Sequence, residues 1–154
     1  MENHTPTNYN QITQNIWLGT NMCCLAHNAT LLKLGFDADL DLEEARPEEP
    51  PHTKIYLWLP TPDHQAPTPS QLQTGVDLIA SLVRQNLKIY LHCKNGHGRA
   101  PTLLTAYLMA TGLDWDAAFN FIKSKRPVVH LNDVQRAALQ VFSTAAPPEP
   151  CKVT

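Results

Sequence analysis

Apolar and polar residues repeat with two different periods along the chain, and the switch between them predicts strands separated by helices. Short apolar runs or strict alternation, which are typical of strands, cover residues 16–19, 36–42, 55–59 and 88–91. Apolar residues at helical spacing fill residues 22–34 and follow Thr68, Arg99, Asp114 and Asn132. This order predicts a single α/β domain with a central, mainly parallel sheet of four to five strands and helices on both faces.

Two segments between these elements have the composition of surface loops. Residues 43–51 are acidic and rich in proline, so we expect a loop in which Glu43 and Glu44 form a solvated face. Three prolines within residues 60–67 exclude helix and sheet interior, and they predict an extended, stiff loop. Thr68 follows with the pattern of a capping box, which fixes where this loop ends and a helix begins.

The composition excludes several classes of protein. The 154 residues suit one domain, which we place at residues 12–145 between a polar tail, 1–11, and a proline-rich tail, 146–154. Lys and Arg number 12 against 14 Asp and Glu, so no basic excess predicts nucleic acid or a membrane surface as partner. No apolar run approaches the ~18 residues of a membrane span, and the first residues lack the pattern of a signal peptide. We therefore expect a cytoplasmic monomer without stable membrane insertion.

Four cysteines do not predict disulfides or a metal site in such a protein. Cys23 and Cys24 are adjacent, and Cys151 lies in the C-terminal tail, so no pair has the spacing of zinc ligands. We expect no metal and no organic cofactor. The remaining cysteine is Cys93, and the residues around it indicate a reactive side chain.

The segment from His92 to Thr102 predicts an anion-binding loop with a nucleophile. A strand leads into Cys93, two glycines follow, and Arg99 opens a helix six positions after the cysteine. Glycines allow successive backbone N–H groups to point inward, and together with the first turn of the helix they form a nest for a tetrahedral anion. Arg99 can add a bidentate hydrogen bond to that anion. The same positive field stabilises a thiolate, which is the reactive form of cysteine.

This segment resembles the signature of the cysteine-dependent protein phosphatases, His-Cys-x5-Arg. The resemblance extends to small dual-specificity phosphatases over most of the chain, through residues 16–19, the Pro62-Asp63 loop and the Arg126-Pro127 bend. It implies that Cys93 is the nucleophile, that Arg99 stabilises the transition state and that His92 supports the loop. It also implies that phosphate binds the amides of the loop, which are contributed by Lys94, Asn95, Gly96, His97, Gly98 and Arg99.

Transfer of phosphate to a thiolate also needs a proton donor for the leaving oxygen. Asp63 is the best candidate, since it lies 30 residues before Cys93 on a loop that follows a core strand. Parallel strands bring such a loop to the sheet edge that carries the cysteine. The resemblance implies a general acid at about this separation. His64 and the pair Glu43 and Glu44 are the fallback acids.

The sequence departs from the family at the residue after the arginine. Most members have serine or threonine there, and the hydroxyl helps the thiolate leave in the second step. Ala100 lacks it, as in the regenerating-liver phosphatases, so we expect a slow second step. Thr102 could replace the hydroxyl, but one turn into the helix we expect it to cap its own backbone. Gln135 either positions water or completes a capping box with Asn132.

The predicted function is therefore hydrolysis of a phosphomonoester on tyrosine, with serine or threonine as further targets, in a phosphorylated protein or peptide. Basic residues at Lys94 and His97 leave a phosphoinositide phosphatase as an alternative. A module that binds phosphorylated partners with slow or no turnover is the rival from another class, and Ala100 favours it. A sulfur-transfer or arsenate-reducing enzyme with a similar loop would not need Asp63.

Overall fold

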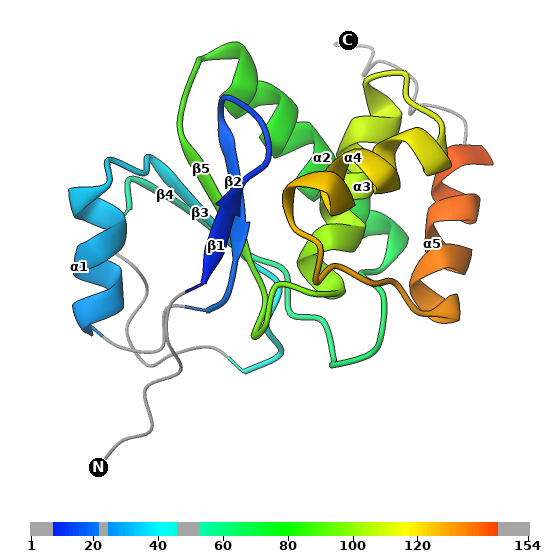
Figure 1. The fold of residues 1–154 in the computed structure, drawn as a ribbon, viewed down its shortest axis with the longest axis horizontal. Coiled ribbons are helices and arrows are strands. Elements are labelled where there is room, and N and C mark those ends of the chain that lie inside the picture. The colour runs from blue at the N-terminus through cyan, green and yellow to red at the C-terminus, as the bar shows by residue number, and fades with distance from the viewer. Residues whose placement is uncertain (1–7, 22–24, 46–52, 145–154) are drawn as a thin grey trace, which may run out of the picture.

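One central sheet organises the protein. The computed structural model describes residues 8–21, 25–45 and 53–144, which form strands and helices around that sheet (Figure 1). The strands are β1 (Tyr9–Gln11), β2 (Ile16–Gly19), β3 (Ala38–Asp41), β4 (Ile55–Trp58) and β5 (Ile89–His92). Their order across the sheet is β1-β2-β5-β3-β4, and every pair is parallel except β1 with β2. The predicted α/β class with a mainly parallel sheet is confirmed.

Helices cover both faces of this sheet, as the sequence predicts. The helices are α1 (Leu25–Lys33), α2 (Pro69–Arg84), α3 (Arg99–Ala110), α4 (Trp115–Lys125) and α5 (Asp133–Thr144). Figure 1 shows α1 on one side of the sheet and the other four helices on the opposite side. Helix α3 is buried almost throughout, because it packs against α2, α4 and α5 as well as the sheet. None of the helices within the described ranges is long and apolar enough to cross a bilayer.

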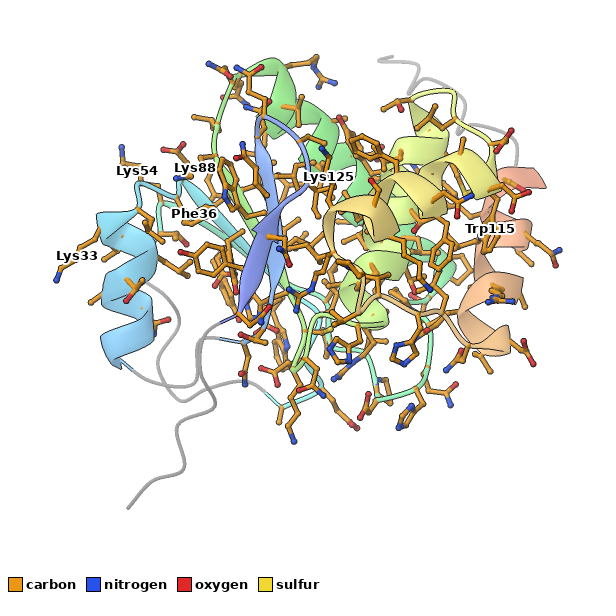
Figure 2. The ribbon with its side chains drawn as sticks, in the orientation of Figure 1. Lys33, Phe36, Lys54, Lys88, Trp115 and Lys125 are labelled. Carbon is orange, nitrogen blue, oxygen red and sulfur yellow. The ribbon has the colours of Figure 1, made fainter. Side chains whose placement is uncertain are left out.

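The two faces have cores of different size. The larger core lies under α2 to α5 and contains the aliphatic side chains of β2, β3 and β5. On the α1 face, Phe36 packs edge-on against Trp17 and Tyr90, with ring centroids 5.3 and 5.4 Å away. Figure 2 shows Phe36 and Lys88 on this side, where the Lys88 ammonium lies 4.5 Å from the Phe36 ring centre. Leu31 of α1 is buried in the same cluster as Phe36 and Tyr90, and this packing holds α1 against the sheet.

The predicted N-terminal tail is wrong at its end, because residues 9–11 form strand β1. Asn8 exchanges hydrogen bonds with Thr20 on the neighbouring chain segment, at 2.9 and 3.1 Å. Tyr9 meets Tyr90 edge-on, and the buried Arg126 binds the side-chain oxygens of Asn8 and Asn10. Polar residues that resemble a tail are here the partners of residues far along the chain.

The direction of the strands decides where chemistry can occur. Strands β2, β3, β4 and β5 all run the same way, so their carboxyl ends meet at one edge of the sheet. His92 ends β5 there, opposite Gly19 of β2 and Asp41 of β3 in the sheet register. The loop after β4, residues 60–67, leaves from the same edge before Thr68 caps α2 with the predicted capping box. Ligand sites of parallel sheets lie at this edge.

Candidate active site

A pocket of about 130 Å³ opens at the carboxyl edge of the sheet. Three segments build it: the loop after β4, the loop between β5 and α3, and the start of α5 with the residues before it. Its walls are formed by Asp63, His64, Cys93, Asn95, His97, Gly98, Arg99, His130, Asn132 and Gln135. The structure thus brings Cys93, Arg99 and Asp63 to one pocket, as their positions along the sequence predict.

The loop after Cys93 depends on its glycines. Gly96 has a φ of 66°, a left-handed conformation that glycine adopts without strain. A Cβ at Gly96 would lie 2.5 Å from the carbonyl oxygen of Gly19, so the loop packs directly on the end of β2. A Cβ at Gly98 would lie 2.9 Å from Nε2 of Gln135. Gly96 is therefore needed for close approach to the backbone at the end of β2, whereas a side chain at Gly98 would displace the amide of Gln135. Cys93, in the same loop, has 3% of its surface exposed.

Arg126 holds this loop from behind. It is 1% exposed, and its Nε and Nη2 donate to the carbonyls of Gly96 and Asn95 at 3.0 and 3.1 Å. In a trans peptide the C=O and N–H bonds point in opposite directions. Because Arg126 draws both carbonyls to its side, the amides of Gly96 and His97 point the other way. From the sequence, Arg126 was recognised only as part of a bend.

Arg126 also lies close enough to Cys93 for their charges to interact. Burial lowers its pKa, whereas the negative charge that Tyr90 or Cys93 can carry raises it. Its Nη1 donates to the side-chain oxygens of Asn8 and Asn10 at 2.7 and 2.8 Å, which fixes the guanidinium from the β1 side. The guanidinium thus adds a fixed positive charge to the amides of the loop.

Arg99 links the cysteine loop to the loop that carries Asp63. Its side chain is buried, and Nη1 donates to the carbonyl of Thr61 at 2.8 Å. Nη2 lies 3.5 Å from Oδ1 of Asp63, whose side chain is 63% exposed. This contact sets the acid candidate at the mouth of the pocket, next to the guanidinium that would hold the anion. His64, the fallback acid, is exposed and lies on the same loop.

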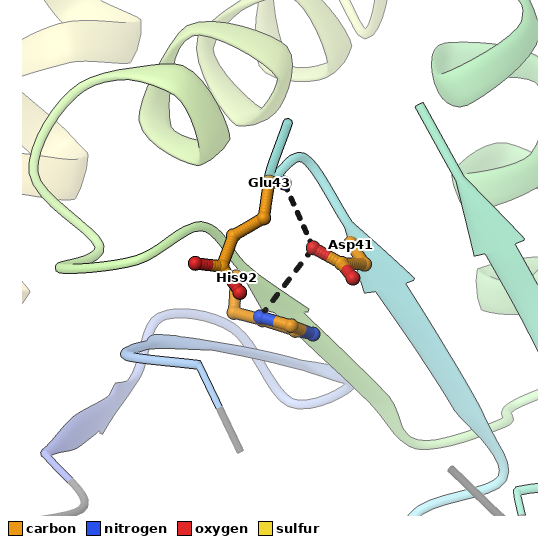
Figure 3. A group of neighbouring side chains, drawn as sticks. All are labelled: Asp41, Glu43 and His92. Atoms are coloured by element: carbon orange, nitrogen blue, oxygen red, sulfur yellow. Dashed lines mark hydrogen bonds and ion pairs between the residues drawn. The ribbon is translucent and has the colours of Figure 1, made fainter. Parts of the chain in front are cut away.

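An acidic cluster surrounds His92 below the loop. Nε2 of His92 lies 2.8 Å from Oδ1 of Asp39. On the other side of the ring, Nδ1 lies 3.9 Å from Oδ1 of Asp41, as Figure 3 shows together with Glu43. Burial lowers the pKa of His92, but the nearby charges of Asp39, Asp41 and Glu43 outweigh it and raise that pKa to about 9. His92 is therefore a buried imidazolium at neutral pH. Burial raises the pKa of Asp41 and of Glu43, and a neighbouring negative charge adds to each increase: that of Asp39 at Asp41, and that of Asp41 at Glu43.

The expected solvated face at Glu43 is wrong. Glu43 is 8% exposed, accepts a hydrogen bond from Asn21 at 3.2 Å and belongs to the His92 cluster. Glu44 is exposed, as predicted, and residues 46–52 lie outside the described ranges. Alternation places apolar and acidic residues on opposite faces of β3, yet both faces are covered, so the acidic side meets His92 instead of water.

The same cluster has the atoms of a metal site but uses them internally. Ligand atoms of Asp41, Glu43 and His92 lie within 4.8 Å of one another. Asp41 already accepts from the amide of Glu43 at 2.8 Å and from the hydroxyl of Tyr56 at 3.1 Å. The His92 imidazolium supplies positive charge among the carboxylates. The arrangement serves as an ion-pair support for the end of β5.

The remaining predicted residues separate into those inside and those outside the pocket. Asn95 and His97 line it, whereas Lys94 is exposed and does not. Burial, Arg126 and His130 all lower the pKa of His97, so its ring is neutral at neutral pH. Ala100 is fully buried in the first turn of α3. The hydroxyl of Thr102 donates to the carbonyl of Gly98 at 2.8 Å and, as expected, caps its own backbone.

Three wall residues come from the segment before α5 and from the first turn of that helix. His130 and Asn132 were not predicted as site residues, and Gln135 was left open. Asn132 and Gln135 do form the capping box that their spacing suggests, with reciprocal bonds of 3.1 and 2.9 Å. The spacing reveals the cap but not that it lies against the pocket.

Comparison with known proteins gives one family. The sequence profile of the dual specificity phosphatase catalytic domain matches residues 16–145. Dual specificity protein phosphatase 5 of Rattus norvegicus is 38% identical over 79 residues, which is 50% of this chain and 21% of that protein. Laforin of Mus musculus is 29% identical over 167 residues, or 91% of this chain and 51% of that protein. The chain therefore spans between about a fifth and a half of these relatives.

Solved structures show the same fold. A mouse putative dual specificity phosphatase complexed with zinc tungstate has a TM-score of 0.77 at 24% identity, covering 93% of this chain and 91% of that one. Human DUSP28 has a TM-score of 0.76 at 24% identity, with coverage of 90% and 95%. PTPMT1 in complex with PI(5)P has a TM-score of 0.77 at 21% identity, with coverage of 88% and 94%.

Proposed function

The chain belongs to the dual specificity phosphatase catalytic-domain family, and from that premise we propose that it hydrolyses phosphomonoesters on proteins through a phosphocysteine intermediate. The substrates we propose are phosphotyrosine and, beside it, phosphoserine and phosphothreonine. One observation carries the proposal: Cys93 and Arg99, from the loop between β5 and α3, line a single pocket with Asp63, which comes from the loop after β4. A thiol, an anion-binding cation and a proton donor are what this reaction needs.

In the first step the Cys93 thiolate attacks phosphorus opposite the ester oxygen. The S–P bond forms as the P–O bond breaks, and Asp63 delivers its proton to the departing alcohol. Arg99 and the inward amides of the loop bind the three equatorial oxygens, whose charge is spread in the transition state. Arg126 supports this binding by holding the loop carbonyls on the opposite side.

In the second step water attacks the phosphocysteine. Asp63, now a carboxylate, accepts a proton from that water, and phosphate leaves as the S–P bond breaks. A hydroxyl after the arginine would stabilise the departing thiolate, and Ala100 offers none. Thr102 donates its proton to Gly98 and so is engaged elsewhere. We therefore propose that hydrolysis of the intermediate limits turnover.

A phosphoinositide is the second candidate substrate. Lys94 and His97 favour it in sequence, and a structural neighbour binds PI(5)P, but that likeness at 21% identity concerns the fold alone. Lys94 does not line the pocket, and the lowered pKa of His97 keeps its ring neutral. These two residues then supply little positive charge for a polyanionic headgroup, which favours a protein substrate. A module that only binds phosphoprotein is less well supported, because the acid Asp63 contacts Arg99.

We further propose that the protein acts as a monomer in the cytoplasm and uses no metal or organic cofactor. All three reacting groups lie in one chain, so the site is complete without a partner subunit. A thiolate nucleophile needs a reducing compartment to stay reduced. Gel filtration of the purified protein and imaging of the full chain in cells test these two points.

Phosphate release from matched substrates tests the function. A phosphotyrosine peptide, the same peptide with phosphothreonine, and a soluble inositol phosphate are compared at equal concentration. We expect the highest kcat/KM with phosphotyrosine and loss of release in Cys93→Ser, whereas Cys151→Ser, a cysteine outside the signature, retains it. Tight phosphopeptide binding without release would favour the binding module, and preference for the inositol phosphate would favour the second candidate.

A further inference from the structure

The loop that carries Asp63 is held in place by side chains of three helices or their caps. We call residues 60–67 the acid loop. Resting on the function proposed above, we propose that Asn132 and Gln135 are positioning residues: they fix the acid loop at the pocket before any substrate arrives. The general acid of this protein would then be set in advance and would not need to be brought in by loop closure.

The backbone of the acid loop is bonded along its length. Gln71 of α2 donates to the carbonyl of Pro60 at 2.9 Å, and Arg99 of α3 donates to that of Thr61 at 2.8 Å. Past the acid, Nδ2 of Asn132 donates to His64 at 2.8 Å, and Nε2 of Gln135 donates to Gln65 at 3.2 Å. Loop carbonyls are usually left to water. Here side chains bind two carbonyls before Asp63 and two after it.

The hydrogen bond from Asn132 acts at the residue of the acid loop that has a left-handed backbone conformation. His64 has a φ of 63°, a left-handed conformation that costs a residue with a side chain free energy and persists only when its surroundings hold it. Asn132 binds the carbonyl of this residue, and Oδ1 of Asp63 accepts from its amide at 3.0 Å. The turn at His64 therefore determines where the Asp63 carboxyl lies.

Asn132 and Gln135 are themselves held firmly. Each accepts a backbone N–H of the other in the capping box of α5, which leaves their NH₂ groups free to donate to the acid loop. Gln135 is 3% exposed and rests against Gly98, where no side chain competes for its place. The start of α5 thus touches the phosphate loop and the acid loop together, and it fixes the distance between them.

Asn132→Ser separates this role from helix capping. Serine is a good N-cap, so α5 still begins there, but the donor to His64 is lost. Gln135→Met removes the second donor at similar volume. We expect kcat/KM for phenyl phosphate, whose leaving group needs a proton, to fall about fivefold in Asn132→Ser, the change that one net hydrogen bond sustains. The loss of kcat/KM for p-nitrophenyl phosphate should be smaller, because its leaving group depends less on a proton. Asn120→Ala, at an exposed position of α4, serves as the matched control.

Two further readouts decide the proposal. In an Asp63→Asn background Asn132→Ser should cause no further loss, because it acts through the missing acid. NMR amide exchange in the free protein should be slow at Gln65, whose N–H donates to Pro62, and at least about fivefold faster in Asn132→Ser. Equal losses on both esters, additive losses with Asp63→Asn, or unchanged exchange would each overturn the proposal. If the wild type releases no phosphate, the proposed function fails while the exchange measurement still decides the positioning role.

Discussion

Removal of Arg126 should damage the phosphate site although its side chain does not line the pocket. Arg126→Met keeps a long side chain of similar width and deletes the guanidinium. Two loop carbonyls, of Gly96 and Asn95, then lose their donors, and β1 loses the cation that binds Asn8 and Asn10. Without these bonds, the peptide planes are no longer held with their N–H groups pointing away from residue 126.

The magnitude follows from the partners that are lost. A hydrogen bond from a charged group contributes roughly 1.5–3 kcal/mol, and Arg126 makes two such bonds to loop carbonyls. Asn8 is exposed and its side chain can turn to water, so the bonds to β1 contribute less. We therefore expect Arg126→Met to lower the free energy of unfolding by about 3–6 kcal/mol. Phosphate binding should weaken about tenfold or more, since reorienting the amides removes ligands of the anion.

Urea denaturation and inhibition by inorganic phosphate measure the two effects. Arg126→Lys is the matched control: it keeps the charge and can reach one carbonyl, so it should fall between the wild type and Arg126→Met. An Arg126→Met protein that is destabilised but binds phosphate with wild-type affinity would refute the argument that the carbonyl bonds aim the amides. An unchanged stability would refute the assigned hydrogen bonds themselves.

Three more predictions concern the loop and its supports. Ala100→Ser should raise steady-state kcat several-fold and leave the stopped-flow burst unchanged; a flat kcat would contradict a slow second step. Because the pKa of His92 is raised to about 9, its contribution to stability, on the order of 3 kcal/mol, should be full below pH 6.5 and lost as pH rises through 9. In Asp39→Asn, the free energy of unfolding measured by urea denaturation should decrease less between pH 6.5 and 9. The same pH dependence as in the wild type would exclude the ion pair. Gly98→Ala should cost about 1–3 kcal/mol by displacing Gln135, and a wild-type Tm would contradict the close packing.

The sequence predicts those parts of the structure that short-range patterns encode. Helical spacing and the capping box at Thr68 place α2, and the alternating apolar residues place β3, because these signals involve neighbours within one or two turns. The pairing of Cys93 with Arg99 is also local, since both belong to one loop. Asp63 could be placed beside them because parallel strands end at a common edge.

The parts that could not be predicted depend on contacts between distant segments. Arg126 and Asn8 are 118 residues apart, so a polar N-terminus gives no sign that it forms a strand around a buried cation. Glu43 looks like part of a solvated loop, and only the folded structure shows that its carboxylate lies near His92, just after β3 has paired with β5. The bonds from Asn132 and Gln135 to the acid loop span about 70 residues and leave no pattern of their own.

The central claim is that Cys93 carries the phosphoryl group between two steps. Wild-type protein mixed with a phosphotyrosine peptide, quenched within the burst and mapped by mass spectrometry, tests it directly. We expect a phosphoryl group on the peptide that contains Cys93, in larger amount in the wild type than in Ala100→Ser and absent in Cys93→Ser. Turnover without phosphoryl-Cys93, or with the phosphoryl group on another residue, would contradict the account.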